Sequence, residues 1–82
     1  MIRVAIADDH EIVRRGLRMT ILGEADMQLV GEAANGQEAV GLAGTARPDV
    51  LLLDIQMPGM DGLAAAQQIH ADWPDVRILI LT

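Results

Sequence analysis

The 82-residue sequence contains no cysteine, phenylalanine, tyrosine or lysine, and it has one tryptophan. The missing cysteines exclude disulfide bonds and thiolate metal sites. Because aromatic residues are nearly absent, Leu, Ile, Val, Ala and Met have to fill any core. Hydrophobic residues make up 51% of the chain, a share typical of folded rather than disordered sequences.

Basic residues are also scarce. The sequence has twelve acidic residues and six arginines, which give a formal net charge of −6. We therefore expect no direct binding of nucleic acid, which requires a basic patch.

Long hydrophobic runs are missing as well. VLLL and ILIL are far shorter than the roughly 20 residues of a membrane helix. The start MIRVAIADDH lacks the layout of a signal peptide. The expectation is a cytoplasmic protein that does not enter a membrane.

Short apolar runs alternate with segments of helical periodicity along the chain. The pattern predicts strands at 2–7, 27–34, 49–54 and 76–82, and helices at 10–22, 37–46 and 62–71. Strands that alternate with helices form right-handed βαβ units and a parallel sheet. The run DVLLLD lacks polar alternation, as expected for a parallel strand that is covered on both faces.

Acidic residues follow two of these predicted strands. Asp8 and Asp9 come after the first strand, and Asp54 ends the third. In open parallel sheets, ligands bind beyond the carboxyl ends of the strands, where the strand order reverses. If the first and third strands are neighbours, the three carboxylates converge there and repel one another. A hard divalent cation such as Mg²⁺ would relieve that repulsion and organise phosphoryl transfer to an aspartate.

Four motifs occur in order: ADDHEIVRRGL, EAANGQEAV, PDVLLLDIQMPGMDGL and the terminal ILT. Together they resemble the receiver domain of bacterial two-component response regulators. The first two motifs, ADDHEIVRRGL and EAANGQEAV, resemble those of the subfamily that carries a helix-turn-helix DNA-binding output domain. The resemblance implies an α/β, flavodoxin-like, doubly wound parallel sheet with strand order 2-1-3-4. It also implies that residues 1–82 form a single, partial receiver domain.

The resemblance also implies roles for individual residues. Asp54 corresponds to the phosphoacceptor, which a sensor histidine kinase would phosphorylate with the help of Mg²⁺. Asp9 and Asp54 would hold the ion directly, Asp8 would act through a water molecule, and the backbone carbonyl of Gln56 would be a further ligand. Thr82 would hydrogen-bond the phosphoryl group and act as the switch. In the full-length protein, an output domain further along the chain would regulate transcription by binding DNA.

The sequence departs from the family in one respect. The complete domain has five strands, five helices and a lysine after the fifth strand, whereas this sequence stops after the fourth predicted strand and has no lysine. We therefore expect the fifth strand and the last helices to be absent. The strand at 76–82 then becomes an edge strand, and we expect the chain to self-associate. Pro58 and Gly59 would shape the loop beside the site.

Several residues also have simpler interpretations. Asp8 and Asp9 suit the N-cap of a helix. His10 is interpreted as a partly exposed packing residue rather than a metal ligand. The three arginines of the first helix are expected to form a solvated face, with a kinase-docking surface as the alternative; they are Arg14, Arg15 and Arg18.

Two other functions remain as alternatives. One is a receiver-like interaction module that is not phosphorylated, which the missing lysine favours. The other is an aspartyl-phosphate phosphatase of the haloacid-dehalogenase type, which needs an acid two residues after the nucleophile. Gln56 occupies that position and is unable to act as a general acid. We therefore expect a signalling module rather than an enzyme that turns over an external substrate.

Overall fold

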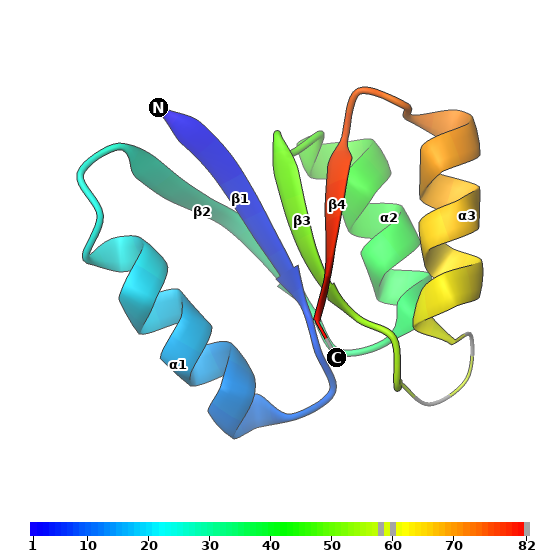
Figure 1. The fold of residues 1–82 in the computed structure, drawn as a ribbon, viewed down its shortest axis with the longest axis horizontal. Helices are drawn as coiled ribbons and strands as arrows, with labels where there is room; N and C mark the ends of the chain where they lie inside the picture. The colour runs from blue at the N-terminus through cyan, green and yellow to red at the C-terminus, as the bar shows by residue number, and fades with distance from the viewer. Residues whose placement is uncertain (58, 60, 82) are drawn as a thin grey trace.

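The computed structural model describes residues 1–57, 59 and 61–81. Within these residues, strands and helices alternate along the chain (Figure 1). The elements are β1 (Ile2–Ala7), α1 (Glu11–Leu22), β2 (Met27–Ala33), α2 (Gly36–Ala46), β3 (Val50–Asp54), α3 (Gly62–Asp72) and β4 (Arg77–Leu81). The order predicted from the sequence is confirmed, and the observed bounds lie within about one residue of the predicted ones. None of the helices in the described residues is long and apolar enough to cross a membrane.

The four strands form one parallel sheet in the order β2-β1-β3-β4. This confirms the strand order that the family resemblance implied. The chain first moves outward from β1 to β2 and then returns past β1 to β3, so the strand order reverses between β1 and β3. The carboxyl ends of these two strands therefore flank a switch point, where ligands of open parallel sheets bind.

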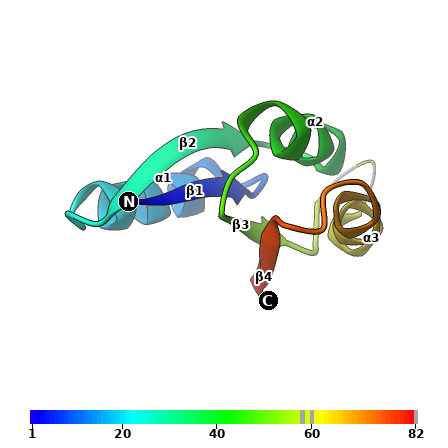
Figure 2. The same cartoon turned by 90° about the horizontal axis from the view of Figure 1, so that it is seen from above.

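The helices cover both faces of the sheet. Figure 2 shows α2 and α3 on one side and α1 on the other. Successive side chains of a strand point to opposite faces of the sheet, so the side chains of β1 pack alternately against the helices on the two faces. Ala5 and Ala7 pack in the cluster that contains α2 and α3, whereas Val4 and Ile6 pack with Ile21 of α1.

Small and aliphatic side chains fill this core in place of aromatic ones. Ala39 and Ala43 of α2 are fully buried, which lets the helix approach the sheet closely. Leu51, Leu53 and Ile69 supply the bulk and are also fully buried; each contributes about 1.5–3 kcal/mol by leaving water. The lone tryptophan, residue 73, is partly buried and packs against the α2–α3 side of the core.

On the α1 side of the sheet, the cover is incomplete. An apolar hollow lies between α1 and the sheet, and Leu52 and Leu79 are among its lining residues. Leu79 of β4, which lines this hollow, is 56% exposed, and Ile80, which faces the α3 side, is 37% exposed. Within the residues that the structure describes, β4 pairs only with β3. The β4 edge of the sheet thus presents both apolar side chains and unpaired main-chain groups.

Candidate functional site

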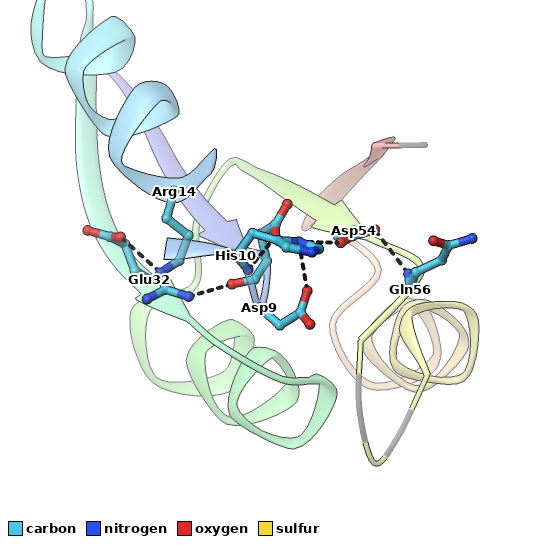
Figure 3. A network of polar contacts seen from close by, with 7 residues as sticks. Asp9, His10, Arg14, Glu32, Asp54 and Gln56 are labelled. Atoms are coloured by element: carbon cyan, nitrogen blue, oxygen red, sulfur yellow. Dashed lines mark hydrogen bonds and ion pairs between the residues drawn. The ribbon is translucent and has the colours of Figure 1, made fainter. Parts of the chain in front are cut away.

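Acidic side chains meet at the switch point between β1 and β3. Asp8, Asp9, His10 and Asp54 each place a potential ligand atom within 4.8 Å of those of the other three. Figure 3 shows the His10 ring next to both Asp9, below it, and Asp54, to its right. The convergence of the three aspartates is the arrangement that the strand order predicted. His10 is an additional member that the sequence had not indicated.

Asp8 is the most restrained member of the cluster. It is 4% exposed, and its Oδ1 accepts the backbone N–H of His10 at 2.8 Å. Its own main chain is held on both sides, since its N–H donates to Ala33 at 3.0 Å and its carbonyl accepts Arg14 Nη1 at 2.6 Å. The N-cap interpretation is wrong for Asp8 and Asp9, because His10 is the N-cap residue of α1 and makes no side-chain capping bond.

The backbone that follows Asp54 orients its carboxylate. The side chain is 14% exposed, and Oδ1 accepts the N–H of Gln56 at 3.0 Å. The other oxygen, Oδ2, lies 3.9 Å from Nδ1 of His10, so it faces the cluster. The side chain of Gln56 points away from Asp54 (Figure 3). The expected role of the Gln56 carbonyl as a metal ligand stays a prediction.

His10 is exposed, as expected, but its contacts differ from those of a packing residue. Its Nδ1 lies 3.0 Å from Oδ1 of Asp8 and 3.0 Å from Oδ1 of Asp9. The hydrogen bond to Asp8, followed by the charge of Asp9, raises the pKa of the His10 imidazole above its usual value. Its position directly after two acids at a strand end was the available signal. That position alone does not predict a contact with the acids, because the direction of the His10 ring is set by the turn between β1 and α1.

Two arginines of α1 do not form a solvated face. Arg18 Nη1 lies 2.7 Å from Glu32 of β2, and Arg14 Nε lies 3.6 Å from the same carboxylate. Arg14 also donates to the carbonyl of Asp8. The expectation fails because β2 packs beside α1 and presents Glu32 to it. Of the three arginines, Arg14 and Arg18 are partly buried and Arg15 is exposed.

The loop from β3 to α3 borders the site. Gly59 has a φ of 78°, in the left-handed region that glycine adopts without strain. Asp61 caps α3 by accepting the N–H of Ala64 at 2.7 Å. Gly59 therefore shapes the loop as expected, whereas Pro58 and Thr82 lie outside the described residues. The switch role of Thr82 stays a prediction.

The donor set suits a hard divalent cation. Mg²⁺ takes octahedral oxygen ligands at about 2.1 Å, which places opposite ligands about 4.2 Å apart. The ligand atoms of the cluster lie within 4.8 Å of one another, a spacing that suits carboxylates held around one ion either directly or through a bound water molecule. Their mutual repulsion would fall when such an ion binds.

Comparison with known proteins identifies the family. The model of the response regulator receiver domain matches residues 4–82. The chain belongs to this family of signalling domains. It is 46% identical over 82 residues to the transcriptional regulatory protein LiaR of Bacillus subtilis, and the match covers 100% of this chain and 39% of LiaR. The chain therefore spans about two fifths of that curated relative.

Solved structures agree with this assignment. The response regulator domain of CheB from Thermotoga maritima matches with a TM-score of 0.94 and 36% identity, over 98% of this chain and 59% of that one. RcsB from Salmonella enterica serovar Typhimurium, solved with promoter rprA and the phosphomimetic BeF₃⁻, matches with a TM-score of 0.91 and 30% identity. That match covers 100% of this chain and 69% of RcsB. The predicted receiver fold is confirmed.

Proposed function

We propose that this chain is a phosphorylation-dependent switch in which Asp54 accepts a phosphoryl group from a sensor histidine kinase. The observation that carries the proposal is the position of Asp54, whose Oδ2 faces a cluster of two further aspartates at the switch point. Asp9 and Asp54 would hold Mg²⁺ directly, and Asp8 would act through a water molecule. Thr82 would hydrogen-bond the transferred group.

The chemistry assigns Asp54 the role of nucleophile. A new O–P bond forms at Asp54, the P–N bond of the donor phosphohistidine breaks, and the electron pair returns to the imidazole nitrogen, which takes up a proton. The N–H of Gln56 holds Oδ1 at 3.0 Å, which leaves Oδ2, on the side of the cluster, as the attacking oxygen. Mg²⁺, when bound, supplies positive charge to the crowded carboxylates and phosphoryl oxygens.

This function is self-modification rather than turnover of an external substrate. Asp54 is both the nucleophile and the carrier of the product, and Gln56 offers no acid for phosphatase chemistry. A receiver-like interaction module that is not phosphorylated is the second candidate. Labelling of Asp54 separates these two candidates.

The partners follow from the same reasoning. RcsB, one of the similar proteins, has been solved on promoter DNA with a phosphomimetic, and LiaR is named as a transcriptional regulator. We infer that the full-length protein regulates transcription in the cytoplasm through a DNA-binding output domain. The net charge of −6 argues that this segment itself does not contact DNA.

The test is phosphate incorporation from a small phosphodonor in the presence of Mg²⁺. Asp54→Asn should abolish the incorporation of hydroxylamine-labile phosphate. Asp75→Asn is the matched control, because Asp75 is an exposed aspartate outside the cluster, and it should label like the unmodified chain. Undiminished labelling of Asp54→Asn would exclude Asp54 as the acceptor. Absence of labelling in the unmodified chain would favour the non-phosphorylated module.

A further inference from the structure

Arg14 of α1 joins the end of β1 to the neighbouring strand β2. Its Nη1 donates to the main-chain carbonyl of Asp8 at 2.6 Å, and its Nε lies 3.6 Å from Oε1 of Glu32 in β2 (Figure 3). The side chain of Arg14 is 20% exposed and that of Glu32 is 23% exposed, so both contacts are partly shielded from water. One planar guanidinium, with its rigid fork of donors, thus binds a carbonyl and a carboxylate at once.

These contacts hold the main chain of Asp8 from both sides. Its N–H donates to the carbonyl of Ala33 at 3.0 Å, which continues the pairing of β1 with β2 one residue beyond Ala7. Its carbonyl belongs to the next peptide group, the one that leads to Asp9, and Arg14 fixes the direction of that group. Arg14 therefore acts at the point where the chain leaves the sheet.

The spacing of the three aspartates depends on this peptide group. Asp8 and Asp9 come from the end of β1, whereas Asp54 comes from β3 and is oriented by the N–H of Gln56. A rotation of the peptide between Asp8 and Asp9 would move the Asp9 carboxylate relative to Asp54, and the spacing that suits one cation would be lost. Groups that orient metal ligands in this way typically change metal affinity by about 10–100-fold when they are removed.

The charge of Arg14 acts in the opposite direction. A guanidinium beside the carboxylates repels an incoming cation, so its removal should, by charge alone, tighten metal binding. Glu32 lowers that repulsion, because its carboxylate faces both Arg14 and Arg18. The direction in which the metal affinity changes therefore separates an effect of position from an effect of charge.

From these contacts, we propose that Arg14 is a positioning residue of the metal site, which fixes the carbonyl of Asp8 and is itself held in place by Glu32. The proposal rests on the metal site of the proposed function. It adds to that site the two residues that keep the aspartates at a spacing suited to one cation, without contacting the ion themselves.

The experiment is calorimetric titration of the chain with Mg²⁺. Arg14→Met removes the donors and the charge but keeps a long side chain, and it should weaken Mg²⁺ binding by about tenfold. Arg14→Lys keeps the charge and a donor for the carbonyl of Asp8, although not the planar fork, and it should recover part of that loss.

Arg18→Met is the matched control. Arg18 pairs with the carboxylate of Glu32 at 2.7 Å, and within the part of the chain that the structure describes no hydrogen bond joins it to Asp8, so Arg18→Met should leave the Mg²⁺ affinity unchanged. Unchanged or tighter binding by Arg14→Met would show that Arg14 does not position the aspartates. An equal loss in Arg18→Met would assign the effect to the ion pairs of Glu32, and either result overturns the inference.

Amide exchange of the metal-free chain gives a second readout that requires no ion. The N–H of His10, which donates to Asp8 at 2.8 Å, should exchange faster in Arg14→Met, because the turn has lost one anchor and opens more readily. It should keep its rate in Arg18→Met, and equal rates in both variants and the unmodified chain would also overturn the inference. If Arg14→Met does not fold, Arg14→Gln, which has a favourable helix propensity, is measured in the same two ways.

Asp54→Asn distinguishes the failure of this inference from the failure of the proposed function. Unchanged Mg²⁺ affinity in Asp54→Asn would contradict the metal site itself. Weaker binding in Asp54→Asn together with unchanged binding in Arg14→Met would contradict only the role of Arg14.

Discussion

The α-carbon of Gly62, the first residue of α3, lies directly against the main chain of Asp54. A Cβ atom added at this position would overlap the Asp54 carbonyl oxygen and the α-carbon of Ile55, and it would lie 2.9 Å from the Asp54 carbonyl carbon. The N–H of Gly62 donates to the carbonyl of Ile55 at 3.0 Å. The start of α3 is thus fixed against the backbone of the proposed phosphoacceptor.

Gly62→Ala should therefore disturb both stability and the site. The obstacle is main chain, which has little freedom to move, so we expect a loss of about 1–3 kcal/mol in the free energy of unfolding. Phosphate incorporation should fall as well, because Asp54 has to shift. Urea unfolding and labelling with a small phosphodonor measure the two effects.

Gly41→Ala is the matched control for this substitution. Gly41 lies inside α2, and a Cβ atom there would meet nothing within 4 Å. Alanine should stabilise the helix by about 0.5–1 kcal/mol and leave labelling unchanged. Equal stability of Gly62→Ala and the unmodified chain would contradict the contact between α3 and Asp54.

The sequence predicted the elements and the convergence of the aspartates because both depend on strong local patterns. Apolar runs of strand length defined the four strands, and the parallel sheet then brought Asp54 toward Asp8 and Asp9. The family resemblance supplied the strand order. None of this required knowledge of side-chain directions.

What the sequence missed depends on contacts across long separations or on a turn. Arg18 and Glu32 are 14 residues apart, and their pairing follows only once α1 packs beside β2. The direction of the His10 ring is set by the Asp8 turn. The need for glycine at position 62 could not be predicted either. A glycine at the start of a helix has many explanations, and the contact of Gly62 with the main chain of Asp54 depends on the three-dimensional fold.

Metal binding should stabilise the folded chain by relieving carboxylate repulsion. At a metal concentration about a hundredfold above Kd, the gain is about 2.7 kcal/mol. Asp9→Ala should reduce the shift of the thermal midpoint caused by Mg²⁺, while the metal-free protein stays as stable or becomes more stable because one repelling charge is removed. Thermal unfolding with and without Mg²⁺ measures both. Equal Mg²⁺ shifts in the two proteins would argue against Asp9 as a ligand.

Glu32 should contribute to stability through its two arginine partners. Glu32→Gln keeps the shape of the side chain but removes the charge that faces Arg14 and Arg18. Because the pairs are partly exposed, we expect a loss of about 0.5–1 kcal/mol, which should shrink as salt is added. Arg15→Gln should change stability by less than about 0.5 kcal/mol. Chemical unfolding at low and high salt tests this, and a salt-independent loss would exclude an electrostatic cause.

Self-association is expected at the β4 edge of the sheet. Leu79 is 56% exposed and lines the apolar hollow on the α1 side, and β4 carries one charged residue, Arg77. Long apolar edges with few charges pair readily with other strands, and contiguous apolar patches are rarely left exposed by monomers. A second copy of the chain would cover both the edge and the hollow.

Light scattering of the 82-residue chain at micromolar concentration should therefore give the mass of a dimer or a larger species. Leu79→Lys should lower that mass, because a charge on the edge strand opposes pairing. Ile12→Lys is the control, since Ile12 is an apolar residue of α1 that is 81% exposed and does not line the hollow; it should associate like the unmodified chain. A monomer with cooperative unfolding would show that the exposed face of β4 needs no partner, and equal masses for the two lysine variants would place the contact elsewhere.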